Sequence, residues 1–460
     1  MRFLMRAFFT LILVAVTALG GAYLVAGRMA GPAIEISRPE KFIGAATPLA
    51  VTVTAPGGAV SALQVLLEQD GKQTPVFTLG DNASGPAPQV SGDTLTLTRE
   101  LGKQTVPDLK SGPARLIVTA SHPVLRGIRT VQSTATRDLQ VRLERPRVSV
   151  VSTHHFVNQG GTELVVYRVS PEDVESGVLV GDLEYPGYPA TGAVVEGITL
   201  TDPSLRVAFY ALMYDQNATS TPIRVFARDQ AGNSARADFD FRIFPKAFKR
   251  SRIEIDDRLL DRVVPAILEG TSEVKPEGDN LAKFLSINGD LRRKNAAKIA
   301  SFAKQTSPEM LWGGVVFHPF TNSAVESAFA DDRTYTYKGK EVDRQTHLGF
   351  DLASIAGNPI VAANRGKVLF ADELGIYGNT VILDHGMGVQ SLYAHLSSIE
   401  VNVGDMVEKE QTVGRSGRTG MALGDHLHFT MLVNGHMVNP IEWWDAHWIE
   451  DRILRKLRGQ

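Results

Sequence analysis

Four histidines and one aspartate in the last quarter of the chain have spacings that suit a metal site. His347 and Asp351 lie four residues apart, His395 follows alone, and His426 and His428 flank a single leucine. Catalytic zinc sites use imidazole and carboxylate ligands, with three protein ligands and one position left open for water or substrate. The chain has no cysteine, so any metal must be held by His, Asp or Glu. The pattern therefore indicates a zinc site that activates water.

The residues that follow the last two histidines predict the strand that positions them. Residues 429–433 are apolar or β-prone, Phe-Thr-Met-Leu-Val. Residues two apart on a strand project from the same face, about 6–7 Å from each other. His426 and His428 can therefore serve one site while Leu427 points into the core. The spacing alone leaves open which of the two histidines binds the metal.

Three motifs, taken in order, resemble the lysostaphin/LytM-type zinc metalloendopeptidases. They are His347-Leu-Gly-Phe-Asp351, Leu-Tyr-Ala-His-Leu at 392–396, and Gly-Asp-His-Leu-His-Phe at 424–429. Shorter matches lie between and after them, at 404–407, 413–420 and 438–440. Each motif alone is weak, but the ordered set is specific. The resemblance covers residues 313–445 and says nothing about residues 28–245.

The resemblance implies a role for each of the five residues. His347, Asp351 and His428 match the ligands of one Zn²⁺, and His395 and His426 match the catalytic histidines around the activated water. It also implies an antiparallel-β domain and a zinc-dependent endopeptidase that hydrolyses the peptide cross-links of peptidoglycan in cell-wall remodelling. No ligand or catalytic position is replaced here, whereas some relatives have lost zinc and only activate other wall hydrolases.

Two alternatives remain open at this stage. The first is a zinc-retaining regulator of other cell-wall hydrolases, autoinhibited or non-catalytic. An insertion before His347, with Tyr335, Tyr337 and Lys338, is expected to shape or cover the cleft. The second is a structural adaptor, because residues 401–408 also resemble a hairpin of biotinyl/lipoyl-type domains, although such domains do not need the histidines. His385, in a predicted turn, is interpreted as structural.

The N-terminus predicts a membrane helix. Residues 7–27 carry no charge, and as a helix they would span about 30 Å, the thickness of the hydrocarbon core. Arg2 and Arg6 precede them, so residues 1–6 are expected to form a cytoplasmic tip. A cleaved signal peptide is the alternative, because small residues lie near the end of the run. We predict a single-pass protein of the cytoplasmic (inner) membrane whose bulk is periplasmic.

The rest of the chain is predicted to be mainly β. Period-two alternation, as at 139–144 and 239–243, predicts two immunoglobulin-like β-sandwich modules at 28–145 and 146–245. Residues 225–233 resemble the late-strand signature of bacterial immunoglobulin-like domains. Apolar residues at three- and four-residue steps predict a helical connector at 246–312, whose first helix Pro265 interrupts. The zinc peptidase domain at 313–445 and a solvated C-terminal helix at 446–460 complete the chain.

Length and charge limit the partners. A chain of 460 residues has room for two to four domains. With 48 basic and 50 acidic side chains, the net charge of −2 gives no reason to expect nucleic acid. The expected partners are peptidoglycan peptides, the membrane through the N-terminal helix, and proteins that bind the β-sandwich modules.

Overall fold

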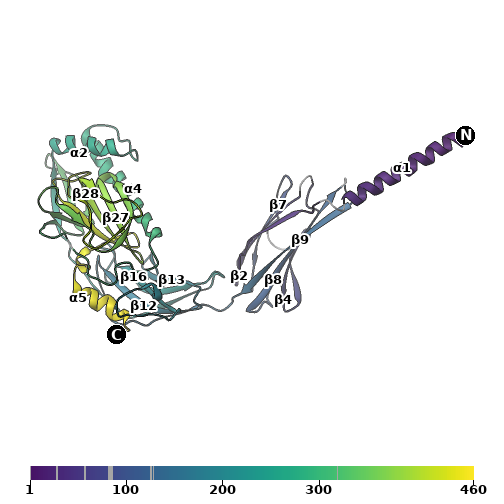
Figure 1. The fold of residues 1–460 in the computed structure, drawn as a ribbon, viewed down its shortest axis with the longest axis horizontal. Coiled ribbons are helices and arrows are strands. Elements are labelled where there is room, and N and C mark those ends of the chain that lie inside the picture. Colours follow the sequence, from purple (N-terminus) through teal and green to yellow (C-terminus); the bar gives the residue numbers. More distant parts are fainter. Residues whose placement is uncertain are drawn as a thin grey trace. The chain divides into compact units, whose positions relative to one another are not determined.

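The computed structural model describes residues 2–26, 30–55, 58–80, 86–124, 127, 129–318 and 320–459 (Figure 1). Strands account for 45% of the structure and helices for 19%, so the chain is mainly β, as predicted. It divides into two compact units, Met1–Pro146 with Arg228–Ser234 and Arg147–Ala227 with Ala235–Gln460. The finer predicted domain boundaries stay predictions.

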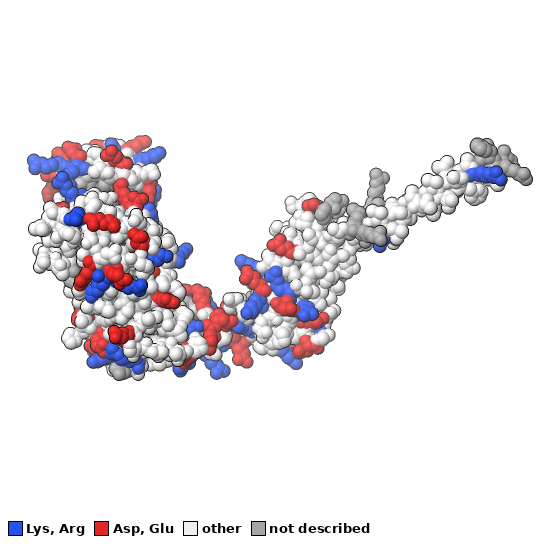
Figure 2. Space-filling view, viewed as in Figure 1, with Lys and Arg blue, Asp and Glu red and all other residues white. Residues whose placement is uncertain are grey.

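The N-terminal helix α1 (Arg2–Ala26) is apolar, as predicted. Its segment Met5–Val25 is long enough to cross a membrane and has a mean hydropathy of 2.2. The helix surface is white, free of charged side chains, along most of its length (Figure 2). Membrane anchors and signal sequences share these properties. Residue 1 of the predicted tip, residue 27 of the predicted anchor and residues 28–29 of the predicted first β module lie outside the described residues.

Two sheets that share one core form the first β module. Alternate residues of facing strands, such as Val51 and Leu97 in one sheet and Val65 and Val118 in the other, are fully buried between the sheets. The first sheet has the order β1 (Ala33–Arg38), β3 (Thr47–Thr54), β7 (Thr94–Leu101), β6 (Gln89–Ser91). The second has the order β2 (Phe42–Ile43), β9 (Arg129–Val141), β8 (Gly112–Val124), β4 (Ala62–Gln69), β5 (Lys72–Thr78).

The second β module is built in the same way. One sheet has the order β10 (Arg147–Val150), β12 (Thr162–Ser170), β16 (Leu205–Ala211), β15 (Tyr188–Pro189). The short 3₁₀ turn η1 (Ala190–Gly192) follows β15 in the chain. Another has the order β14 (Leu183–Pro186), β13 (Glu175–Val180), β17 (Ile223–Arg228), β18 (Ser234–Asp238), and β11 (His155–Asn158) pairs with β19 (Phe241–Phe244). The immunoglobulin-like assignment of both modules stays a prediction.

The connector contains the helices α2 (Asp257–Gly270), α3 (Asn280–Ser286) and α4 (Arg292–Ser301), a π-helical turn η2 (Ile287–Leu291) between the last two, and η3 (Phe302–Gln305). The predicted interruption at Pro265 is wrong, because α2 continues through it. Pro265 lies on the exposed face, where water can satisfy the carbonyl group that its ring leaves without a partner. The connector also begins with a strand, β20 (Arg250–Ile255).

An antiparallel sheet is the centre of the C-terminal domain, as predicted. Its described strands run in the order β21 (Ala324–Ser327), β24 (Phe350–Ala353), β32 (Leu427–Val433), β28 (Val389–Leu396), β27 (Asn379–Gly386), β26 (Gly366–Glu373), β30 (Met406–Val407), and β33 (His436–Val438) also pairs with β32. Two small sheets flank it. One has the order β20, β22 (Asp331–Tyr337), β23 (Lys340–His347). The other has the order β25 (Pro359–Val361), β31 (Thr412–Arg415), β29 (Ser398–Ile399). The turn η4 (Gly375–Tyr377) connects β26 to β27, and the turn η5 (Pro440–Glu442) connects β33 to the C-terminal helix.

The C-terminal helix is not solvated, which corrects the prediction. The segments α5 (Ala446–Ile449), η6 (Glu450–Leu454) and α6 (Arg455–Leu457) follow one another without a break. Ile449, Ile453 and Leu457 recur every four residues and are buried. Lys456 is buried too, and its Nζ lies 2.7 Å from Oε1 of Glu163 in β12. The apolar stripe and this buried ion pair hold the helix against the second β module.

Candidate metal centre

Strand pairing brings the predicted metal ligands together. Asp351 in β24 lies directly opposite His428 in the neighbouring strand β32. His347 is the last residue of β23, four positions before Asp351 along the chain. The register of one strand pair and the turn before it therefore place two imidazoles and one carboxylate at the same point.

The three side chains meet at short distances. His347 Nε2 lies 2.9 Å from Asp351 Oδ1 and 3.0 Å from His428 Nδ1. His428 Nδ1 lies 3.0 Å from the same carboxylate oxygen. All three residues are buried. Among the residues that the structure describes, they are a group whose ligand atoms could hold one metal ion.

The hydrogen bonds around the triangle fit a metal. His347 Nδ1 lies 3.3 Å from the carbonyl oxygen of Ala328, which assigns the ring proton to that side and turns the lone pair of Nε2 towards Asp351 and His428. His428 Nε2 is buried and has no hydrogen-bond partner among the described residues. A cation between the three atoms would take the lone pairs of His347 Nε2, His428 Nδ1 and Asp351 Oδ1 together, and this donor set is one that Zn²⁺ uses.

Electrostatics keep the ligands in the form that binds a cation. Burial by itself raises the pKa of Asp351, but His347, His426 and His428 together hold it well below its ordinary value. Burial lowers the pKa of His428 to about 4, against the opposing effect of Asp351. At neutral pH the carboxylate is therefore ionised and the His428 imidazole is neutral, as metal binding requires.

The glycine between the first two ligands makes room for the third. A Cβ atom at Gly349 would lie 2.5 Å from Cε1 and 2.7 Å from Nε2 of His428. These contacts are too short for any side chain, and the strand that carries His428 is central in the sheet and cannot move away. Gly349 is therefore part of the geometry of the site, although it donates no ligand.

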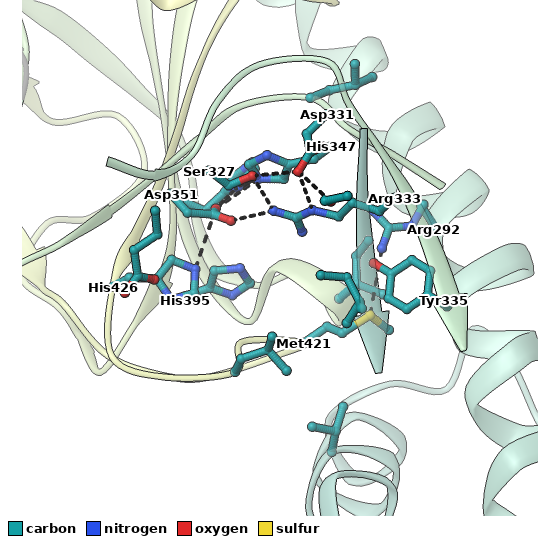
Figure 3. Close-up of a pocket in the computed structure, with 18 of the residues that line it drawn as sticks. Arg292, Ser327, Asp331, Arg333, Tyr335, His347, Asp351, His395, Met421 and His426 are labelled. Atoms are coloured by element: carbon teal, nitrogen blue, oxygen red, sulfur yellow. Dashed lines mark hydrogen bonds and ion pairs between the residues drawn. The ribbon is translucent and has the colours of Figure 1, made fainter. Parts of the chain in front are cut away.

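The two other predicted histidines flank the triangle (Figure 3). His395 Nδ1 lies 2.8 Å from the carbonyl oxygen of Thr419, and His426 Nδ1 lies 3.0 Å from that of Gly424. Each ring thus uses Nδ1 for the backbone and leaves Nε2 for the site. His426 Nε2 lies 3.5 Å from Asp351 Oδ1, and the ring centroids of His395 and His426 are 4.9 Å apart.

His395 has an unusual backbone conformation. Its φ of +63° lies in the left-handed region, which few residues other than glycine adopt and which is common at functional sites. Thr419 supports this conformation, because its hydroxyl donates to the carbonyl oxygen of Leu396 and accepts from the amide of Asn379. The glycine-rich segment 413–420 therefore holds His395 in place.

The environments of the two flanking histidines differ. Burial lowers the pKa of His395 well below its ordinary value, and the neighbouring His426 and His428 lower it further. For His426, burial is outweighed by Asp351, which raises the pKa above its ordinary value. Two titratable groups whose pKa values are moved apart are typical of sites that transfer protons.

Arg333 is a residue of the site that the sequence did not reveal. Its Nη2 lies 2.8 Å from Asp351 Oδ2 and 2.8 Å from Ser327 Oγ. It therefore holds the carboxylate oxygen that does not face the histidines. Alternation in β22 places Asp331, Arg333 and Tyr335 on one face, a pattern visible in the sequence. The partners of Arg333, however, lie in β21 and β24, two strands of another sheet.

A cavity of about 230 Å³ opens in front of the triangle, and connector residues help to line it. They are Lys249, Ser251, Ile253, Ile255, Leu259, Val263, Phe284 and Arg292. Tyr335, from the insertion before His347, lines the cavity as well. The cleft is thus shaped by three parts of the chain, namely the large sheet, the β22–β23 hairpin and the connector.

The tip of the β22–β23 hairpin is bound to the connector. Tyr337 Oη donates to Asp257 Oδ1 at 2.5 Å, and Lys338 Nζ lies 3.4 Å from Asp257 Oδ2.

His385 has a structural place, as interpreted from the sequence. It is fully buried, and its ring bonds to the carbonyl oxygen of Arg365 and to Ser391 Oγ.

The site is a candidate metal centre on an antiparallel sheet, and comparison with known proteins identifies the family of the domain that carries it. Residues 345–440 match the sequence profile of Peptidase family M23, so the C-terminal part of the chain is a domain of that family. The predicted resemblance to the lysostaphin/LytM-type enzymes is confirmed for this domain.

Curated relatives match a part of the chain of similar length. The chain is 40% identical over 95 residues to "DD-carboxypeptidase/endopeptidase Mpg" of Neisseria meningitidis serogroup B, which is 21% of this chain and 22% of that protein. It is 36% identical over 96 residues to "Peptidoglycan DD-endopeptidase ShyA" of Vibrio cholerae serotype O1, again 21% of this chain and 22% of that protein. The match thus spans about a fifth of the length of these relatives.

Solved structures are similar as well. A peptidase M23 structure from Pseudomonas aeruginosa has a TM-score of 0.39 at 20% identity and covers 63% of this chain and 94% of that chain. The catalytic domain of lysostaphin from Staphylococcus simulans has a TM-score of 0.24 at 28% identity and covers 27% of this chain and 92% of that chain.

We predict that Gly349→Ala weakens metal binding by about 10–100-fold, because the added methyl group displaces the ring of His428. Titration of the metal-free protein with Zn²⁺ in the presence of a competing chelator measures the affinity. Gly424→Ala is the matched control, since nothing lies within 4 Å of a Cβ there. Unchanged affinity in Gly349→Ala would show that the ring of His428 does not depend on this space.

Proposed function

We propose that the protein is a zinc-dependent endopeptidase that hydrolyses peptide cross-links of peptidoglycan in cell-wall remodelling. The observation that carries the proposal is the convergence of His347, Asp351 and His428 beside His395 and His426 in one cavity. Support comes from the family of the domain and from the relatives named as peptidoglycan DD-endopeptidases.

Each residue has a place in the proposed reaction. His347, Asp351 and His428 would hold one Zn²⁺ per domain. When bound, zinc supplies Lewis-acid polarisation of the peptide carbonyl and activation of water. Arg333 keeps Asp351 oriented through the second carboxylate oxygen.

The two flanking histidines, His395 and His426, are proposed to carry out the proton transfers. Nδ1 of His395 and Nδ1 of His426 are both committed to backbone carbonyl oxygens, so each ring can use Nε2 for the reaction. One proton must leave the attacking water and one must reach the departing amine nitrogen. We propose that His395 and His426 accept and return these protons and so contribute general acid–base catalysis.

The first prediction from this mechanism separates metal binding from proton transfer. We expect His428→Ala to lose zinc and to release no uncross-linked muropeptides from purified sacculi. We expect His395→Ala to keep zinc but to lose activity by about 10²–10⁴-fold, the usual contribution of a general acid or base. Mass spectrometry of the digest and metal analysis measure both effects.

The exposed residue His447 provides the control, since His447→Ala should change neither quantity. An active His428→Ala variant, or zinc-loaded parent protein that releases nothing, would contradict the proposed hydrolysis.

A second candidate function has structural support of its own. The connector lines the cavity, and Arg262 Nη2 in α2 donates to the carbonyl oxygen of Ala422 at 3.1 Å, at the edge of the cleft. Together with the contacts of Asp257, these bonds hold α2 to both sides of the cleft. This arrangement suits a regulator that retains zinc but is autoinhibited until a partner moves the connector.

The autoinhibited form makes its own prediction. Asp257→Ala combined with Arg262→Ala removes the polar contacts of Asp257 and Arg262 that hold α2 and should raise the rate of sacculus digestion by about tenfold, corresponding to ~1.4 kcal/mol of released restraint. Arg258→Ala, an exposed change on the same helix, is the control. An unchanged or lower rate would exclude α2 as a block and favour the constitutively active enzyme.

We propose that α1 anchors the protein in the cytoplasmic membrane as a single-pass helix, with the rest of the chain in the periplasm. The length of its apolar span and the absence of charged residues after Arg6 support this. The β modules, proposed to be immunoglobulin-like, would space the catalytic domain from the membrane or bind partner proteins.

For the anchor we predict that the mature protein stays in the membrane fraction after alkaline extraction and has the mass of the uncleaved chain. Mass spectrometry of the extracted protein decides between anchor and signal. A soluble protein shortened by the length of α1 would show that the segment is a signal sequence.

A further inference from the structure

Arg292 is the first residue of α4 and projects into the cavity of the metal centre (Figure 3). The same cavity is lined by the three candidate ligands and by Tyr377, Met421 and Tyr335. Arg292 thus belongs to the connector by sequence but to the cleft by position. Nothing in the proposed hydrolysis uses it.

The guanidinium of Arg292 has only neutral partners. Its Nη2 lies 2.6 Å from Asn288 Oδ1 and 3.7 Å from Met421 Sδ, and its Nε lies 3.2 Å from the carbonyl oxygen of Asn288. No ion pair to Arg292 is found in the described part of the chain. By contrast, Arg333 pairs with Asp351 in the same cavity, and the neighbouring Arg293 pairs with Asp290.

A half-buried guanidinium that is always charged has unused hydrogen-bond capacity here. Arginine carries five N–H donors in a planar fork that matches the two oxygens of a carboxylate. The described contacts of Arg292 occupy Nε and Nη2 and leave Nη1 unassigned. The cleft therefore contains a cation whose natural partner, an anion, does not come from the surrounding residues that the structure describes.

The side chain is held in this place by its neighbours. Asn288 is fully buried, and its Nδ2 donates to Asp343 Oδ2 at 2.7 Å, which turns its oxygen towards Arg292. Asn288 lies in the π-helical turn η2 directly before Arg292. Such turns are rare and are frequent at functional sites, where they redirect side chains.

Arg292 lies close to the candidate metal centre. Tyr377, which lines the same cavity, has its ring 5.5 Å from that of His428, centroid to centroid. Arg292 is near enough to Tyr377 to oppose the rise that burial causes in the pKa of its phenol. Arg292 and the three candidate ligands line one cavity, so a substrate that occupies this cavity can reach both.

We propose that Arg292 binds a free carboxylate on the residue that follows the scissile amide and thereby selects the substrate. The proposal rests on the proposed peptidase function and specifies its substrate class. A carboxypeptidase acts by definition on a peptide whose leaving residue carries a free carboxylate, and the name of the Neisseria relative includes that activity. A cross-link whose leaving residue retains a free carboxylate offers the same group, whereas a carboxamide at that position lacks the charge.

The experiment compares two synthetic peptides that differ only in a carboxylate or a carboxamide on the residue after the scissile bond. For the zinc-loaded full chain we expect kcat/KM to be about 10–100-fold higher for the carboxylate peptide, the usual worth of a hydrogen bond to a charged group. Arg292→Met should lose this preference by losing rate on the carboxylate peptide alone. Arg292→Lys should retain part of the preference, because it keeps the charge but not the fork.

The matched control is Arg293→Met, whose side chain belongs to the same helix but not to this cavity, and it should keep the preference of the parent. Equal rates of the parent on both peptides would overturn the inference and leave the peptidase function intact. An equal loss on both peptides in Arg292→Met, with zinc retained, would show a structural role and also overturn it.

Failure of the peptidase function has a different signature. If the zinc-loaded parent cuts neither peptide nor sacculi, the proposed hydrolysis fails, and calorimetric binding of the two peptides then decides on Arg292. Tighter binding of the carboxylate peptide that is lost in Arg292→Met would support the inference, and equal binding would overturn it.

Discussion

The geometry of the site depends on one strand pairing, in which Asp351 of β24 lies opposite His428 of β32. The pairing puts a carboxylate and an imidazole on the same face of the sheet at adjacent strands. A slip of β32 by one residue would turn His428 to the other face of the sheet, away from Asp351, so the register is as important as the residue types. His347 reaches the same point only because β23 ends immediately before the turn into β24.

Burying a carboxylate among three imidazoles is costly unless its charge is paired and hydrogen-bonded. Residues outside the ligand set supply hydrogen bonds that offset this cost. Arg333 holds the second oxygen of Asp351, and carbonyl oxygens of Ala328, Thr419 and Gly424 accept from the Nδ1 atoms of three histidines. These contacts choose which nitrogen of each ring faces the cavity. The left-handed backbone at His395 is part of the same arrangement and is held by Thr419.

The connector links the cleft to the remainder of the chain. Its helices bury an apolar face in the same core as the large sheet, and its polar residues meet the edge of the cleft through Asp257, Arg262 and Asn288. One segment thus contributes both to stability and to the walls of the site. A cleft wall that comes from a separate helical segment can differ in position or composition without any change in the metal ligands, which makes it a natural place for substrate selection or for regulation.

Much of this organisation was predictable from local pattern. The apolar N-terminal segment, the mainly β character and the histidine motifs are properties of short stretches, because hydropathy and period-two alternation act within a few residues. The buried C-terminal helix was missed because its stripe of Ile449, Ile453 and Leu457 is short and is surrounded by charged residues. The uninterrupted α2 was missed because a proline is tolerated when its face is exposed, and exposure is not visible in the sequence.

By itself the sequence determined which residues could serve the site, since the motifs around His347, Asp351, His395, His426 and His428 name the chemical groups and their order. Only the tertiary structure decided which nitrogen of each ring faces the cavity, that Gly349 makes space for His428, and that Arg333 and Arg292 belong to the cleft. The physical reason is distance along the chain. These contacts join residues from separate strands and helices, and their existence depends on strand register and helix packing, which no local pattern specifies.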